Sequence, residues 1–266
     1  GPGPYHATSG ANIFTGGSIS LANSAIAPAP SNGTARVACV EFSGFGYKTP
    51  VTITGLAGYG VHDILADNNG SIYLWLPDGD YDFMANDRRC TVKIKNGVGP
   101  SGVTVNGEEA AFGPEHPATA GWDYDAATRT VSLTNAGPFT LSGINERGLV
   151  RILVPDGTAN TVILSNLTLR ATDSGQCAFA LEADVNVSLV LAGANTLASG
   201  DNRAGLEVPA GASLAITNAP GGNAGSLTVT GGSYGAGIGG GNEGDGGTIT
   251  IAGGAVTATG GSYYGA

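Results

Sequence analysis

Two glutamates occupy matching places in two similar segments of the chain. Glu182 lies in LEADVNVSLVLA (181–192), and Glu207 lies 25 positions later in LEVPAGASLAIT (206–217). If these segments are stacked β-strands, the carboxylates are about 4.8 Å apart, so one keeps its proton or both bind a cation. Calcium prefers several oxygen ligands, and Asp184 with backbone carbonyls could complete the set. If both glutamates point into solvent instead, screening makes their repulsion small.

Aromatic residues form a second group of candidates. Tyr234 and Tyr264 recur 30 positions apart in two Gly-Gly-Ser-Tyr segments, and Tyr263 lies beside the second. Trp122 and Tyr124 begin the C-terminal half of the chain. Sugars stack their C–H faces on aromatic rings, so the recurring tyrosines predict a platform for an extended glycan. The alternative is that the tyrosines brace glycine-rich corners and that Trp122 caps a core.

The sequence gives less support for a catalytic site than for a binding site. Residues 117–266 contain no Lys and no His, which leaves a polysaccharide lyase without its usual lysine base and with arginines alone. The acidic residues of this region are scattered, whereas a glycoside hydrolase needs a close pair of carboxyls. The acids in GGGNEGDGG (239–247) predict a flexible corner loop. We therefore expect no catalytic activity, and a lyase or hydrolase is the least favoured reading.

The chain has three cysteines, Cys39, Cys90 and Cys177. An odd number fits no complete disulfide framework, and none of the three belongs to a zinc-type motif. We interpret them as small buried residues, with a Cys39–Cys90 disulfide as an open alternative.

The elements that carry these residues recur along the C-terminal half. Leu164 and Leu189 are 25 positions apart, and GTITI (247–251) follows ASLAI (212–216) at 35. Two longer apolar series repeat at comparable spacing: Leu169, Leu197, Leu227 and Val256 at 28, 30 and 29, and Leu181, Leu206 and Ile238 at 25 and 32. Three short alternating strands per unit, separated by Gly, Asn, Asp and Ser, predict an all-β fold with a right-handed parallel β-helix.

The remaining chain divides into further pieces. Residues 1–27 contain NIFTGGSISL, which predicts the terminal turn of a preceding β-helix, and a Pro-rich linker follows at 28–35. Alternating strands and turn signals over 36–105 predict a small antiparallel β-sandwich. Residues 106–121 are predicted to form a linker or cap. Residues 122–266 are predicted to form the β-helix, which is cut within its last repeat. The chain is therefore expected to be a fragment of a longer repetitive protein.

Composition limits the class of partner. The chain of 266 residues has 46 Gly, 41% hydrophobic and 12% charged residues, and a net charge of −10. This balance provides no basic surface for nucleic acid or anionic lipid. The sequence also has no apolar run long enough to span a bilayer.

The segment GGSYGAGIGGGNEGDGGTITIAGGAVTATGGSYYGA resembles glycine-rich repeats of bacterial surface and secreted proteins. Residues 122–230 are similar to clostridial-type carbohydrate-binding proteins with a polysaccharide-lyase-like β-helix. The segment ADNNGSIYLWLPDGDYDF resembles prealbumin-like sandwiches that space surface modules. These resemblances imply an extracellular or cell-surface location, glycan binding without catalysis, and calcium. They provide no binding residue at a fixed position.

We therefore expect a non-catalytic carbohydrate-binding module whose partners are a polysaccharide and flanking repeats of the same chain. Weak contacts from each repeat would add up along an extended polymer. A structural stalk or adhesin spacer without glycan binding is the alternative, since it explains low charge and repetition equally well.

Overall fold

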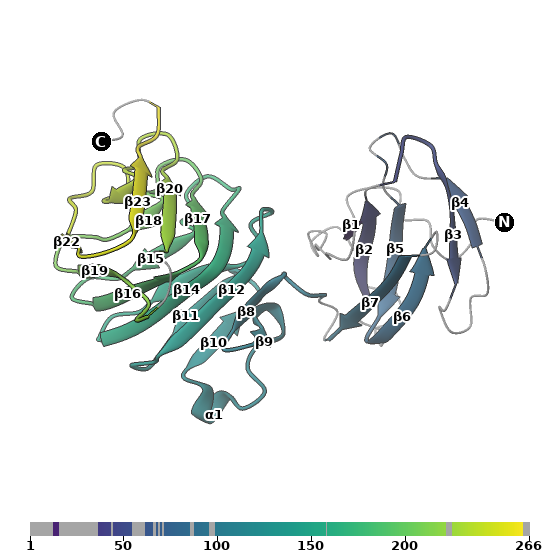
Figure 1. Cartoon of the computed structure of the whole chain (residues 1–266), viewed down its shortest axis with the longest axis horizontal. Coiled ribbons are helices and arrows are strands. Elements are labelled where there is room, and N and C mark those ends of the chain that lie inside the picture. Colours follow the sequence, from purple (N-terminus) through teal and green to yellow (C-terminus); the bar gives the residue numbers. More distant parts are fainter. Residues whose placement is uncertain are drawn as a thin grey trace. The chain divides into compact units, whose positions relative to one another are not determined.

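The computed structural model describes residues 13–15, 37–43, 45–54, 62–65, 68, 70, 72–85, 88–95, 99–157, 159–221 and 225–262. The chain divides into two compact units, Gly1–Gly102 and Val103–Ala266. Both consist mainly of β-strands, as the sequence predicts (Figure 1). The described helices are no longer than the four residues of α1 (Pro117–Ala120), far too short to cross a membrane.

The first unit contains two small sheets. One sheet has the strand order β1–β2–β5, with β1 at Ile13–Thr15, β2 at Val37–Ser43 and β5 at Ile72–Pro77. The other has the order β4–β3–β6–β7, with β4 at His62–Leu65, β3 at Pro50–Thr54, β6 at Gly79–Ala85 and β7 at Arg88–Ile94. Apart from β1, all described pairs in this unit are antiparallel.

Two of the predicted domain boundaries differ from those in the structure. Strand β1 pairs in parallel with β2, with Ile13 opposite Glu41, so residues 13–15 belong to a sheet of the first unit and not to a separate β-helix turn. The predicted linker at 28–35 lies outside the described residues. Strand β8 (Val103–Val105) pairs with the second unit, because its alternating side chains, Val103 and Val105, are buried in that unit's core.

The second unit contains two larger sheets. In the six-stranded sheet the order is β10 (Trp122–Asp125), β11 (Thr130–Leu133), β13 (Arg151–Val154), β15 (Phe179–Leu181), β18 (Leu206–Glu207) and β21 (Ile238–Gly239). All of its pairs except β10–β11 are parallel.

The ten-stranded sheet is mainly parallel as well. Its main path runs from β9 (Glu108–Glu109) and β8 through β12 (Phe139–Asn145), β14 (Ala159–Arg170), β16 (Asn186–Ala192) and β19 (Ser213–Asn218) to β22 (Thr248–Ile251). Alongside it, the second half of β14 continues through β17 (Ala194–Ala198) and β20 (Ser226–Thr230) to β23 (Ala255–Thr259).

The chain visits the two sheets alternately, so each passage through both forms one repeat. We number the repeats 1 to 5, at 130–145, 151–170, 179–198, 206–230 and 238–259. Each repeat pairs in parallel with the next, and the offset is 27 residues between Ile152 and Phe179 and between Phe179 and Leu206. It then rises to 32 between Leu206 and Ile238. This arrangement stacks every strand on its equivalent in the preceding repeat.

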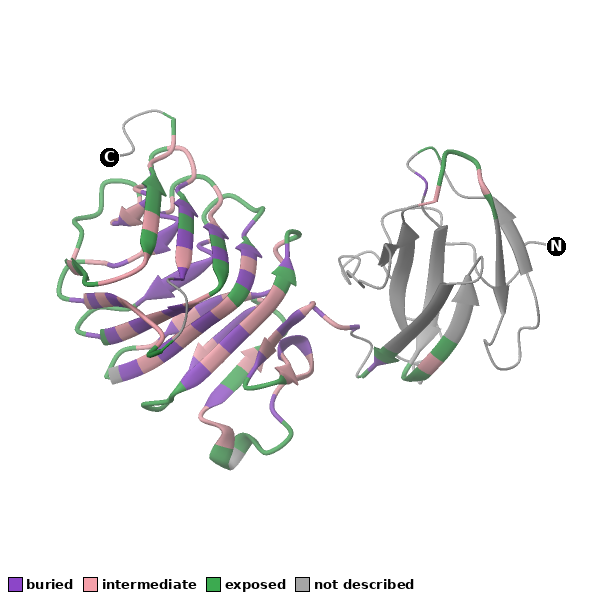
Figure 2. Cartoon of the chain, viewed as in Figure 1, coloured by how far each residue is buried: buried purple, intermediate pink, exposed green. Residues whose placement is uncertain are grey.

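Equivalent apolar residues form continuous rows inside the second unit. One row contains Ile152, Phe179 and Leu206, and each is almost fully buried. Along the longer strands of this unit, buried residues alternate with more exposed ones (Figure 2). The last repeat is different, since Ile251 continues the row of Ile216 but is 52% exposed. The inward face of repeat 5 is therefore only partly covered.

The predicted register is correct in some places and wrong in others. The offsets of 28 for Leu169–Leu197, 29 for Leu227–Val256 and 35 for Ser213–Thr248 are confirmed. The offset of 25 is wrong, because Leu189 pairs with Val162 and not with Leu164. A slip of two residues keeps every side chain on its predicted face, so the alternating pattern alone cannot detect it.

A column of glycines explains the recurring Gly-Gly segments. Gly200, Gly232 and Gly261 occupy equivalent corners of repeats 3, 4 and 5. A Cβ atom on Gly200 would overlap the carbonyl oxygen of Asp173, one on Gly232 would overlap that of Gly200, and one on Gly261 that of Gly232. Successive repeats therefore approach closely enough at this corner to exclude any side chain.

We expect Gly232→Ala to lower the free energy of unfolding by about 1–3 kcal/mol, because the new methyl group forces neighbouring corners apart. Urea unfolding followed by circular dichroism measures the change. Ser233→Ala in the same corner is the control, since its Cβ is already accommodated. Equal stability of Gly232→Ala and the wild type would contradict the close approach.

A matched pair of substitutions tests the uneven burial of one row. Ile216→Ala removes a buried side chain and should cost about 2–5 kcal/mol. Ile251→Ala, at the equivalent position of repeat 5, should cost less than about 1 kcal/mol, because Ile251 is already half exposed. Unfolding of both variants under one set of conditions gives the difference, and similar losses would show that repeat 5 is covered in solution.

Candidate functional site

The predicted aromatic residues have different environments. Trp122 is 2% exposed and belongs to the core at the start of the second unit. Tyr124 packs against that core, its hydroxyl donates to the carbonyl of Leu149 at 3.3 Å, and burial raises its pKa to about 12. These two residues therefore brace the first repeats. Tyr263 and Tyr264 lie outside the described residues.

Tyr234 is the predicted aromatic residue that remains at the surface, with 43% of its area exposed. It occupies the corner between β20 and β21, where its backbone φ is 64°. Gly175 and Asn202 hold the equivalent corners of repeats 2 and 3, 59 and 32 positions earlier, with φ of 76° and 67°. The corner thus requires the left-handed region, which glycine and asparagine tolerate and tyrosine rarely adopts.

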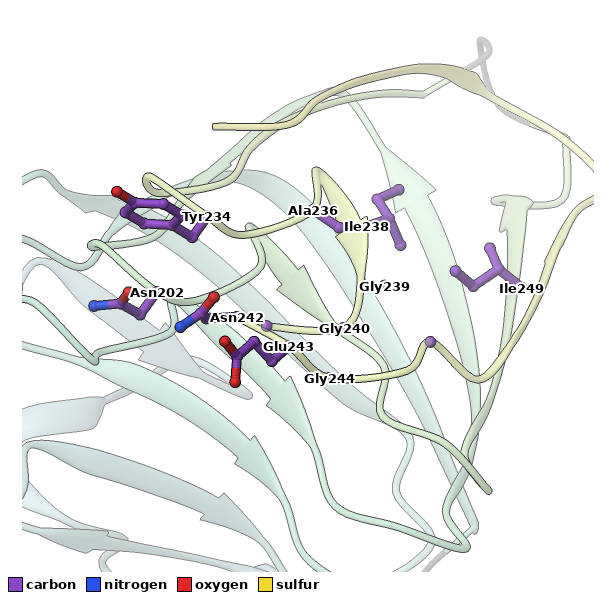
Figure 3. A pocket seen from close by; sticks show the side chains of 12 residues that line it. Asn202, Tyr234, Ala236, Ile238, Gly239, Gly240, Asn242, Glu243, Gly244 and Ile249 are labelled. Carbon is purple, nitrogen blue, oxygen red and sulfur yellow. The ribbon is translucent and has the colours of Figure 1, made fainter. Parts of the chain in front are cut away.

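A pocket of about 850 Å³ opens beside Tyr234. One wall is polar, and there Figure 3 shows the side chains of Asn202, Asn242 and Glu243 close together near the tyrosine ring. Ile238 and Ile249 lie toward the other side of the pocket (Figure 3). The rest of the lining consists of Ala236, Gly239, Gly240, Gly241, Gly244 and Gly246. The glycines leave the backbone accessible to a ligand.

Backbone hydrogen bonds hold the polar wall in place. The amide of Asn202 donates to the carbonyl of Ser233 at 2.7 Å, and the amide of Asn242 donates to the carbonyl of Asn202 at 3.0 Å. The amide of Gly244 closes the loop by donating to Gly241 at 3.1 Å. The equivalent corners of repeats 3 and 4 and the loop between β21 and β22 are therefore linked by backbone hydrogen bonds.

An ion pair lies behind the glycine wall. Nη2 of Arg203 is 2.8 Å from Oε1 of Glu207, whose side chain is only 13% exposed. Oε2 of Glu207 is buried and has no hydrogen-bond partner among the described residues, and a Cβ on Gly241 would come within 3.3 Å of it. Burial raises the pKa of Glu207, and the nearby Arg203 opposes that effect.

The predicted metal ligands are not brought together. Glu207 pairs with Ala180, so Glu182 is two residues out of register with it. Glu182 is exposed and its Oε2 accepts from the amide of Asp156 at 2.8 Å, while Asp184 occupies an exposed corner with a φ of 59°. Within the described ranges no group of three or more acidic, His or Cys side chains could hold a metal ion. Calcium binding by the chain stays a prediction.

The third cysteine, Cys177, is fully enclosed. Its thiol donates to the carbonyl of Phe179 or Ala204, each at 3.1 Å, and burial raises its pKa to about 11. Cys39 and Cys90 lie in β2 and β7, which belong to different sheets of the first unit.

Sequence reasoning missed three residues of the pocket, Asn202, Asn242 and Glu243. A signal for Asn202 was available, because it precedes Tyr234 by the 32 residues that separate repeats 3 and 4. Asn242 and Glu243 lie where the offset grows from 32 to 35 residues, so the loop is an insertion specific to repeat 5. An insertion has no equivalent in other repeats and cannot be aligned.

Comparison of the chain with models of known protein families, with curated proteins and with solved structures finds no match.

The buried carboxyl of Glu207 predicts a pH-dependent stability. Because its pKa is raised above 4.5 in the folded chain, the unfolded chain releases this proton first as the pH increases. The stabilisation that protonated Glu207 gives to the folded chain is complete below pH 4.5 and is lost as the pH rises through the folded-state pKa of Glu207. We expect the wild type to lose stability relative to Glu207→Gln over this interval.

Denaturant unfolding at a series of pH values tests this expectation, with Glu146→Gln as the control because Glu146 is exposed. Parallel stability profiles of the wild type and Glu207→Gln would contradict it.

Proposed function

We propose that the second unit is a right-handed parallel β-helix with three short strands per turn, and that the first is a small antiparallel β-sandwich. The regular parallel pairing at offsets of 27 residues and the alternation between two sheets support the first assignment. The two sheets of 3 and 4 strands, in which every described pair except β1–β2 is antiparallel, support the second.

We further propose that the chain is a non-catalytic carbohydrate-binding module at the cell surface or outside the cell. The observation that carries this proposal is the exposed ring of Tyr234 beside Asn202, Asn242 and Glu243 on one wall of a pocket of about 850 Å³. An aromatic face binds the C–H surface of a sugar, while amides and a carboxylate bind its hydroxyl groups. The combination suits a sugar better than a purely apolar ligand.

The backbone of Tyr234 supports a functional role. A left-handed φ costs a residue with a side chain about 1–2 kcal/mol relative to glycine. Repeats 2 and 3 avoid most of that cost with Gly175 and Asn202, whereas repeat 4 carries a large aromatic residue there. Strain of this kind is concentrated at ligand-binding positions. Tyr234 is therefore better explained by its exposed ring than by the needs of the corner.

The alternative function, a structural spacer without glycan binding, is favoured by another observation. The inward side chains of repeat 5, including the half-exposed Ile251, form an apolar surface at an unpaired strand edge of the described stack. Such a surface suits stacking against another β-layer. The two functions make different demands on Tyr234, because a spacer does not need its ring.

Replacing Tyr234 by Ala should abolish glycan binding and leave folding intact, since the corner accommodates smaller residues in other repeats. Binding is measured on soluble glycan arrays and by pull-down with insoluble cellulose and pectin, with and without EGTA to include the predicted calcium. The control is Tyr47→Ala, because Tyr47 is 64% exposed but lies in the first unit.

Binding that survives Tyr234→Ala would exclude this pocket as the glycan site. A folded wild-type chain that binds no polymer would favour the structural spacer.

A further inference from the structure

The pocket beside Tyr234 has charge of one sign only among its described lining residues. Of its described lining residues only Glu243 is charged, and it is exposed on the polar wall. No described residue forms an ion pair or hydrogen bond with the Glu243 side chain. Asp245 follows two residues later on the same loop and is also exposed. The pocket therefore presents negative charge that nothing described in the protein neutralises.

Cations are scarce around this wall. Residues 117–266 contain no Lys and no His, so positive charge in the second unit comes mainly from arginines. Arg203 follows Asn202 directly, but its guanidinium donates to Glu207 behind the glycine wall at 2.8 Å. A bound carboxylate or sulfate would thus find no cation among the lining residues, and it would approach a chain with a net charge of −10.

We infer that this pocket selects glycans that carry free amino groups, such as polymers of glucosamine, over acetylated or acidic polymers. The inference rests on the proposed glycan-binding function and names the substrate class of that site. The ammonium group would pair with the carboxylate of Glu243, while the sugar ring stacks on Tyr234. The tyrosine face itself also attracts cations, so both groups favour the same ligand charge.

The expected size of the preference for glucosamine follows from the solvent exposure of Glu243. An exposed ion pair changes an affinity by about two- to fivefold, because water screens most of the attraction. We therefore expect glucosamine oligomers to bind about two- to fivefold more tightly than N-acetylglucosamine oligomers of equal length. Added salt should reduce the difference, since screening weakens exposed charge pairs first.

Isothermal titration calorimetry of the full chain tests this inference with three probes, namely oligomers of glucosamine, of N-acetylglucosamine and of galacturonate. The titrations are run at mildly acidic pH, where the sugar amine carries its proton. Glu243→Gln should remove the preference for glucosamine, so that the ratio of the affinities for the amino and acetylated oligomers falls to about one. Glu146→Gln is the matched control, because it removes an exposed glutamate elsewhere in the same unit.

Equal affinities for the amino and acetylated oligomers, or tight binding of galacturonate, would overturn the inference even if Tyr234→Ala abolishes binding. A preference that persists in Glu243→Gln would overturn the assigned role of Glu243. Absence of binding to any of the three oligomers would overturn the inference as well. The function fails with it only if the arrays and polymers also show no binding, so the two failures are distinguishable.

Discussion

Direct stacking of each repeat on the preceding one, at about the 4.8 Å spacing of paired strands, is the constraint on which the second unit depends. It places equivalent residues in contact, so inward rows must be apolar and of similar size, as in Ile152, Phe179 and Leu206. Polar residues in these rows differ in how their side chains are satisfied. The side chain of Asn195 bonds to the backbone of Leu167, Ala192, Gly193 and Ser226. The side-chain amide of Asn160 is buried with no hydrogen-bond partner among the described residues.

The candidate site lies where this constraint is weakest. Strands must keep their spacing, but corners can lengthen without disturbing the rows. The offset between repeats 4 and 5 grows to 35 residues through the loop that carries Asn242 and Glu243. The corner before this loop accommodates a left-handed residue, and Tyr234 occupies it with its side chain partly exposed. The regular part of the repeat therefore supports the fold, and its irregular part provides the chemistry of the pocket.

Much of the fold could be predicted from the sequence, because alternation and repetition survive in the residues themselves. The inward faces, the glycine corners and the offsets at Leu169, Leu227 and Ser213 follow from those patterns. The partner of a strand is harder to predict when two registers preserve the same faces, and this misplaced Glu182 relative to Glu207. Of the polar wall of the pocket, Tyr234 was predicted, and Asn202 was predictable from its 32-residue offset to Tyr234. Asn242 and Glu243 were not, since their loop repeats nowhere else in the chain.

The direction of the hydrogen bonds has a mechanical consequence. In the second unit they run from one repeat to the next, so a force along the stack loads all interfaces between repeats equally and in series. The weakest interface can break while the others remain paired. Release of one 27-residue repeat would free about 90–100 Å of extended chain. Under tension the unit should therefore lengthen in steps of one repeat, absorbing work gradually and not in a single rupture.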